Sequence, residues 1–145
     1  MQRAEATASI PAPAGDLFAF LADPTNLPNW QTGILSAELT SQPPVGVGSK
    51  ARVVRQLMGQ RIVADLVMTA FEPDHRLVLE STVSGVAAVA TLELAPRDDG
   101  TELHFTMSFT AQSIFMAPFE GMAAGAAQGD LASSLDRLRD HFREG

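Results

Sequence analysis

Four tight turns constrain the fold of this chain more than any other feature of its sequence. They fall at residues 59–60, 73–76, 85–86 and 97–100, where glycine, proline and aspartate favour reversal of the chain. Apolar stretches between such turns are typical of strands, and a short turn joins antiparallel neighbours. The sequence therefore predicts five consecutive antiparallel strands between residues 49 and 110.

The same turns predict which side chains share one face of the sheet. Opposed residues in an antiparallel pair point to the same side, so counting outward from each turn assigns the pairs. The predicted pairs are Leu57 with Ile62, Arg55 with Ala64, Met68 with Ser81, Leu79 with Leu92, Val83 with Ala88, Ser81 with Ala90, Leu92 with Phe105, Ala90 with Met107, and Ala88 with Phe109. Together they give one apolar inner face, on which a band of small residues lies between larger ones.

The N-terminal third of the chain adds two strands and two short helices. Alternation of small apolar and polar residues over 2–10 indicates a half-buried strand. Apolar residues over 17–21 indicate a short helix, and a second helical turn over 26–30 carries the only tryptophan, Trp30. A further strand is predicted from residue 33 to residue 41.

Residues 113–142 are predicted to form one long C-terminal helix. Leucines recur at helical spacing at 131, 135 and 138 and make an apolar stripe with Phe142. Toward the N-terminal end this stripe continues through alanines, and glycines flank it at four-residue spacing. Small residues there indicate either close approach of the helix to the sheet or a space left for a ligand. An antiparallel sheet crossed by one long helix belongs to the α+β class.

Polar residues interrupt the otherwise apolar surface between sheet and helix. Arg55 projects from the inner face of the sheet, Glu120 ends the helical stripe, and Gln128 lies at its edge. A buried arginine needs an acidic partner or a ligand oxygen, unless its long stem lets the guanidinium reach water. These residues are the candidate polar groups of a site.

Composition excludes several classes of function. A net charge of −7 and a pI near 4.8 argue against a nucleic-acid-binding protein. The chain has no cysteine and its three histidines have no metal-ligand spacing, so we expect no metal and no cofactor. It contains neither a recognisable leader nor the ~20 apolar residues that cross a bilayer, so we expect a cytoplasmic protein without an integral membrane segment. The length fits a single domain over residues 1–145.

Several short segments are similar to those of one known family. They are Ile10-Pro11-Ala12-Pro13, residues 17–24, Leu27-Pro28-Asn29-Trp30, Val45-Gly46-Val47-Gly48-Ser49, Phe71-Glu72-Pro73 with Arg76-Leu77, and Gly100-Thr101-Glu102-Leu103. Over essentially its whole length the chain resembles the polyketide cyclase/dehydrase and lipid-transport family of the START-related (SRPBCC) superfamily, which shares the birch-pollen-allergen fold. The resemblance implies a helix-grip fold, in which a seven-stranded antiparallel sheet curls round a long C-terminal helix and encloses a hydrophobic cavity.

Members of this superfamily include ligand carriers, aromatase/cyclases, hormone receptors and accessory proteins of larger enzymes, so three functions stay open. We expect binding of a hydrophobic small molecule, such as a lipid or polyketide, by a monomer or homodimer. The alternative is a cyclase/dehydrase-type enzyme acting on a polyketone, with Arg55 stabilising an anion or enolate and Glu120 as base or counter-ion. The third is an accessory or docking module of a larger enzyme. The predicted ligand-binding residues are Trp30, Arg55, Leu66, Met68, Ser81, Ala90, Phe105, Met107, Phe109, Phe115, Phe119, Ala124 and Gln128.

Overall fold

The computed structural model describes residues 2–57, 59–83 and 85–144, and it has the α+β helix-grip architecture that the resemblance implies. The strands are β1 (Gln2–Ile10), β2 (Ile34–Leu39), β3 (Lys50–Leu57), β4 (Gln60–Glu72), β5 (Arg76–Val83), β6 (Val86–Arg97) and β7 (Gly100–Ala111). The helices are α1 (Ala14–Ala22), the 3-10 turn η1 (Pro24–Asn26), α2 (Leu27–Trp30), the 3-10 turn η2 (Ile114–Met116) and α3 (Ala117–Glu144).

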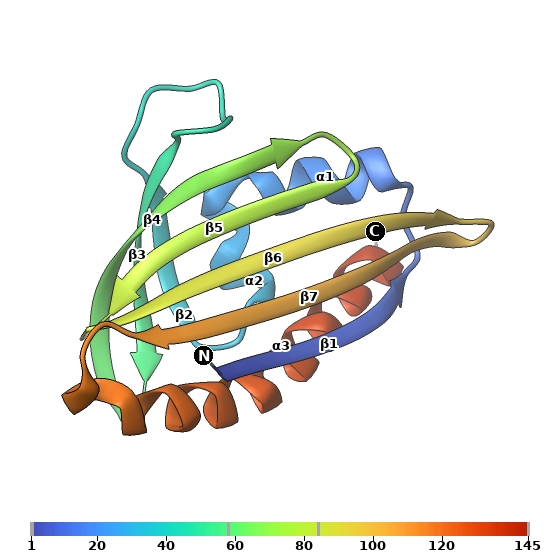
Figure 1. The fold of residues 1–145 in the computed structure, drawn as a ribbon. Helices are drawn as coiled ribbons and strands as arrows, with labels where there is room; N and C mark the ends of the chain where they lie inside the picture. The colour runs from blue at the N-terminus through green and yellow to red at the C-terminus, as the bar shows by residue number, and fades with distance from the viewer. Residues whose placement is uncertain (1, 58, 84, 145) are drawn as a thin grey trace.

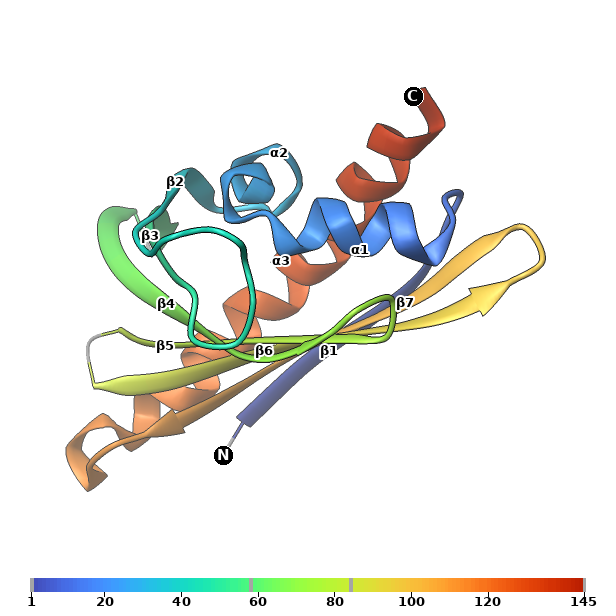
Figure 2. The ribbon, with the colours of Figure 1, turned by 90° about the horizontal axis from the view of Figure 1, so that it is seen from above.

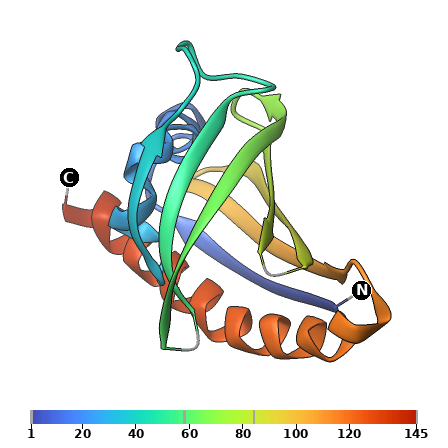
Figure 3. The ribbon, with the colours of Figure 1, turned by 90° about the vertical axis from the view of Figure 1, so that its left-hand side faces the viewer.

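The seven strands form one antiparallel sheet in the order β1-β7-β6-β5-β4-β3-β2. This sheet curls, and α3 runs across its open side (Figures 1 and 3). Seen from above, α1 and α2 lie beside the C-terminal half of α3, whereas its N-terminal half extends away from them (Figure 2). The concave face of the sheet is therefore covered by three helices at one end and by α3 alone at the other.

The predicted pairing of β6 with β7 is confirmed residue by residue: Leu92 opposes Phe105, Ala90 opposes Met107, and Ala88 opposes Phe109. In two other hairpins the register differs from the prediction by two residues, because the turns are tighter than the count assumed. The observed pairs there are Leu57 with Gln60, Arg55 with Ile62, Val83 with Val86, Ser81 with Ala88, Leu79 with Ala90 and Leu77 with Leu92. Glycines at positive φ, 78° at Gly59 and 79° at Gly85, make these tight reversals possible. A shift of two residues keeps every side chain on its predicted face.

β4 and β5 pair along only part of their length. Met68 opposes Leu79, where we predicted Ser81, because the turn places Glu72 opposite Arg76, one residue tighter than the count, and the register shifts by one more residue between Met68 and Ala70. Pairing of these two strands starts at Val67 and Glu80, and among the described residues no ladder joins the first half of β4 to the last residues of β5. The two strands diverge beyond that point, which leaves space on the concave side of the sheet.

The apolar stripe of α3 packs as predicted along the C-terminal half of the helix. Leu131, Leu135 and Leu138 are buried in the core, together with Ala124 and Ala127 nearer the N-terminal end. The three flanking glycines behave differently from both of our interpretations. A Cβ built on each of them meets no atom within 4 Å, so they face neither a close strand nor a ligand; they are Gly121, Gly125 and Gly129.

Gly100, at the tip of the β6–β7 hairpin, provides a test of the packing between that hairpin and the end of β1. Its φ is +148°, and a Cβ there would overlap the carbonyl oxygen of Ile10. We predict that Gly100→Ala lowers the free energy of unfolding by roughly 3 kcal/mol, through backbone strain and overpacking together. Urea unfolding measures the loss.

The matched control is Gly46→Ala, because Gly46 has no atom within 4 Å of the added carbon. We expect that variant to change the free energy of unfolding by no more than about 0.5 kcal/mol. Equal losses for the two variants would contradict the close approach seen at Gly100.

Candidate functional site

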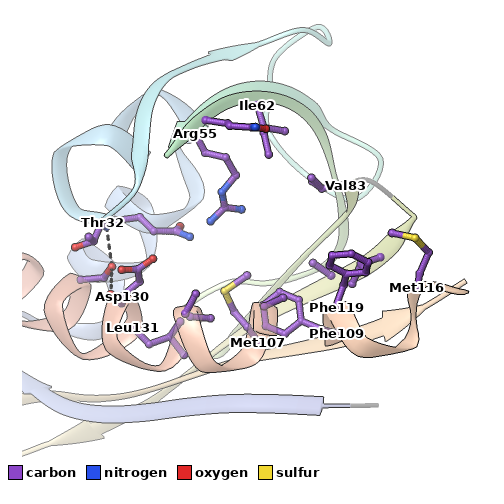
Figure 4. Close-up of a pocket in the computed structure, with 18 residues that line it drawn as sticks. Thr32, Arg55, Ile62, Val83, Met107, Phe109, Met116, Phe119, Asp130 and Leu131 are labelled. Atoms are coloured by element: carbon purple, nitrogen blue, oxygen red, sulfur yellow. Dashed lines mark hydrogen bonds between the residues drawn. The ribbon is translucent and has the colours of Figure 1, made fainter. Parts of the chain in front are cut away.

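A cavity of about 330 Å³ lies between the concave face of the sheet and the N-terminal half of α3. Figure 4 shows that its two ends differ: Thr32, Arg55 and Asp130 gather at one, and Met116 and Phe119 lie at the other. The apolar lining residues are Ile62, Val83, Val86, Ala88, Met107, Phe109, Met116, Phe119, Ala123, Ala126, Ala127 and Leu131. The polar lining residues are Gln31, Thr32, Arg55, Gln60, Asp130 and Ser134. The cavity therefore has a polar end and an apolar end.

Hydrogen bonds fix the polar end by joining the segment after α2 to α3. The backbone N–H of Thr32 donates to Ser134 Oγ at 2.8 Å, and Thr32 Oγ1 lies 2.9 Å from Ser133 Oγ. The Ser134 hydroxyl in turn donates to the carbonyl oxygen of Asp130 at 2.6 Å. These hydroxyls have protein partners, so the remaining polar groups of the lining are the charged side chains of Arg55 and Asp130 and the amides of Gln31 and Gln60.

Arg55 comes from β3, between Ile34 of β2 and Ile62 of β4, and its side chain points into the cavity (Figure 4). Its Nε is buried and has no hydrogen-bond partner in the part of the chain that the structure describes. Burial lowers the pKa of the guanidinium below its ordinary value, and the nearby carboxylate of Asp130 opposes that change. A buried donor without a partner is costly, so the cavity favours a molecule that offers it an oxygen.

Asp130 faces the cavity from α3. Its carboxylate lies beneath the loop after α2, where a Cβ on Gly33 would be 3.7 Å from Asp130 Oδ2. Burial raises the pKa of this carboxyl above 3.8, and the charge of Arg55 partly offsets the rise. The two groups influence each other electrostatically, yet no direct ion pair within 4.0 Å joins them among residues 2–57, 59–83 and 85–144.

Four of the residues that we predicted for ligand binding line this cavity together: Arg55, Met107, Phe109 and Phe119. Phe115, in η2, is 85% exposed near the apolar end, and the structure places it outside the lining.

The other apolar candidates lie outside the lining of this cavity. Leu66 and Met68 border a small hollow beneath α1 and η1. Trp30 and Phe105 are buried together in the core, with their ring centroids 5.6 Å apart, and neither lines the cavity. The small candidates Ser81, Ala90 and Ala124 are likewise outside the cavity lining: Ser81 borders a groove where β4 and β5 diverge, and Ala90 and Ala124 pack with the core.

The two remaining polar candidates bind backbone groups outside the cavity lining. Gln128 Nε2 donates to the carbonyl oxygen of Glu5 at 2.7 Å, and Glu5 N–H donates to Gln128 Oε1 at 3.2 Å, so this side chain ties α3 to β1. The backbone N–H of Ala111 donates to Glu120 Oε2 at 2.7 Å and lowers the pKa of that carboxyl. Sequence reasoning missed several lining residues, of which Asp130 is the only charged one among the described residues. One signal pointed to it, since Asp130 lies three residues after Ala127 of the stripe, at helical spacing.

The model of the family described as polyketide cyclase/dehydrase and lipid transport matches residues 1–143. The chain belongs to the polyketide cyclase/dehydrase and lipid transport family. A search of curated proteins finds no significant match. Membership in this family and the fold together support a protein that binds a hydrophobic ligand.

Solved structures share the fold of this family member at low sequence identity. A Thermus thermophilus protein is 19% identical with a TM-score of 0.79, covering 98% of this chain and 97% of its own. A START superfamily protein from Mycobacterium smegmatis is 14% identical with a TM-score of 0.78, covering 97% and 99%. Ara h 8.0201 is 15% identical with a TM-score of 0.76, covering 99% of both chains. These likenesses establish the helix-grip fold.

No helix in the described part of the chain is long and apolar enough to cross a membrane. Within the same residues, no three histidine, aspartate or glutamate side chains gather as metal ligands would.

The raised pKa of Asp130 predicts a pH-dependent difference between the wild type and Asp130→Asn. A carboxyl whose pKa is higher in the folded state stabilises the fold below its ordinary pKa of 3.8, and that contribution is lost as the pH rises through the raised value. We therefore expect the stability of the wild type, relative to Asp130→Asn, to fall as the pH rises from 3 to 7. Urea unfolding across this range measures it, with Asp140→Asn on the exposed side of α3 as the control. A difference that is constant with pH would contradict the shift.

Proposed function

We propose that this protein binds one compact, largely apolar small molecule in the cavity between the sheet and α3. The observation that carries the proposal is the cavity itself, with apolar side chains along most of its wall and the unpartnered Nε of Arg55 at one end. Apolar walls with a few convergent polar groups are the usual composition of a small-molecule site. The net charge of −7 makes a nucleic acid an unfavourable partner.

The size of the cavity restricts the ligand. A volume of about 330 Å³ equals that of roughly eleven water molecules at ~30 Å³ each. A cavity of this size is at the small end of ligand sites and suits a compact molecule with one or two rings or a short chain. A two-chain phospholipid would have to leave most of its length outside the cavity.

Filling the cavity tests the proposal. Ala123 lines it from α3, so Ala123→Phe places a large side chain in the ligand's volume, whereas Ala132→Phe adds the same side chain on the exposed face of that helix. We expect the wild type and Ala132→Phe to bind small bicyclic aromatic compounds, and Ala123→Phe to bind them at least tenfold more weakly. Native mass spectrometry and fluorescence titration measure binding. Equal affinity in all three proteins would rule out this cavity as the site.

A cyclase/dehydrase-type reaction is the second candidate, because an unpartnered guanidinium in an apolar cavity is suited to stabilising an enolate oxygen. Glu120, our sequence candidate for the base, does not line the cavity and accepts a hydrogen bond from Ala111. Asp130 is the carboxylate that does line it.

A small diketone tests this second candidate. Intramolecular aldol condensation of 2,6-heptanedione gives 3-methylcyclohex-2-enone and one water, and the enone is detected by its ultraviolet absorption. We expect Arg55→Gln to reduce turnover at least a hundredfold, as loss of an oxyanion donor does, and Arg61→Gln, at an exposed position on β4, to leave it unchanged. Turnover by Arg55→Gln at the wild-type rate would dismiss catalysis by Arg55.

A further inference from the structure

The polar end of the cavity contains one cation and one anion. Among the described lining residues, Arg55 from β3 and Asp130 from α3 are the only charged side chains, and Figure 4 shows them facing each other across the space. Their charges sum to zero, so this end of the cavity is strongly polar but has no net charge.

Both groups retain unused hydrogen-bonding capacity. Arg55 Nε–H is a buried donor without a partner, and neither carboxylate oxygen of Asp130 accepts a hydrogen bond in the described part of the chain. The hydroxyl of Thr32 is hydrogen-bonded to that of Ser133. The hydroxyl of Ser134 accepts from the backbone N–H of Thr32 and donates to the carbonyl oxygen of Asp130. A ligand that satisfies both charged groups must present an acceptor to Arg55 and a donor to Asp130, side by side.

The carboxylate of Asp130 also discriminates against anions. A ligand carboxylate placed on Arg55 would lie close to a second negative charge in an apolar site, and like charges in such a site favour uptake of a proton by one of them. A neutral head group with adjacent acceptor and donor meets no such repulsion. Carboxamides, enolised β-dicarbonyls and β-hydroxy ketones have this arrangement.

We propose that the cavity is selective for neutral donor–acceptor head groups over carboxylates, with Arg55 receiving the ligand's acceptor and Asp130 its donor. The ligand's apolar part then lies toward Phe109 and Phe119, at the other end of the cavity. This inference rests on the proposed binding function and adds the chemical class and the orientation of the ligand.

The test compares two compounds of equal size, 2-naphthamide and 2-naphthoate, at pH 8 by titration calorimetry. We expect the wild type to bind the amide at least tenfold more tightly than the carboxylate. Asp130→Asn removes the anion and supplies an amide donor, so it should reverse the preference by at least tenfold. Asp140→Asn, on the exposed side of the same helix, should keep the wild-type preference.

A second measurement needs only the wild type and does not depend on a variant that folds. Calorimetry in two buffers of different ionisation enthalpy reports the protons taken up on binding. We expect protons to be taken up when naphthoate binds and none to be taken up when naphthamide binds.

A failure of the selectivity can be distinguished from a failure of ligand binding itself. If both compounds bind but the wild type prefers naphthoate, or Asp130→Asn keeps the wild-type ratio, or naphthoate binds without proton uptake, the selectivity is overturned while the cavity remains a binding site. If neither compound binds to the wild type or the variants, the binding function fails and the selectivity fails with it.

Discussion

The side chains on the core-facing side of α3 become smaller from its C-terminal half to its N-terminal half, and the rest of the structure depends on this gradient. Leu131, Leu135 and Leu138 fill the space beneath the sheet where α1 and α2 also pack. Further toward the N-terminus the same side carries the short side chains of Ala127 and Ala123, which line the cavity. Dense packing requires side chains that fill the interior, and the short side chains of these alanines leave a cavity instead.

The divergence of β4 from β5 reinforces this effect from the opposite wall. Ile62 and Val83 belong to strands that no longer pair at that point, and both line the cavity. Arg55 and Asp130 lie where the alanine-lined part of α3 meets its leucine-rich part. The sheet and the helix thus bring one basic and one acidic side chain to the polar end of a mostly apolar cavity. Such a site can change without altering the leucine core.

Sequence reasoning predicted the fold well because strand parity is robust. The β6–β7 register follows directly from the turn before Gly100, and two-residue errors elsewhere left Arg55 and Val83 on the correct face. It predicted the cavity lining less completely. Strand pairing says which face a side chain occupies but not which helix covers it, so Met68 and Phe105 could not be separated from Phe109. Asp130 was missed because it lies beside the helical stripe and not within it.

The glycines of α3 have a consequence for the helix end that covers the cavity. Gly121, Gly125 and Gly129 are exposed and unconstrained by neighbours, and each lowers helix stability by roughly 1 kcal/mol relative to alanine. Together they raise the population of locally unfolded N-terminal turns by on the order of a hundredfold. The leucine-rich turns that follow remain anchored in the core. Low helix propensity thus makes the end of α3 that covers the cavity the part of the helix most susceptible to local unfolding, against which the hydrogen bonds of Gln128 and Glu120 hold it to β1 and β7.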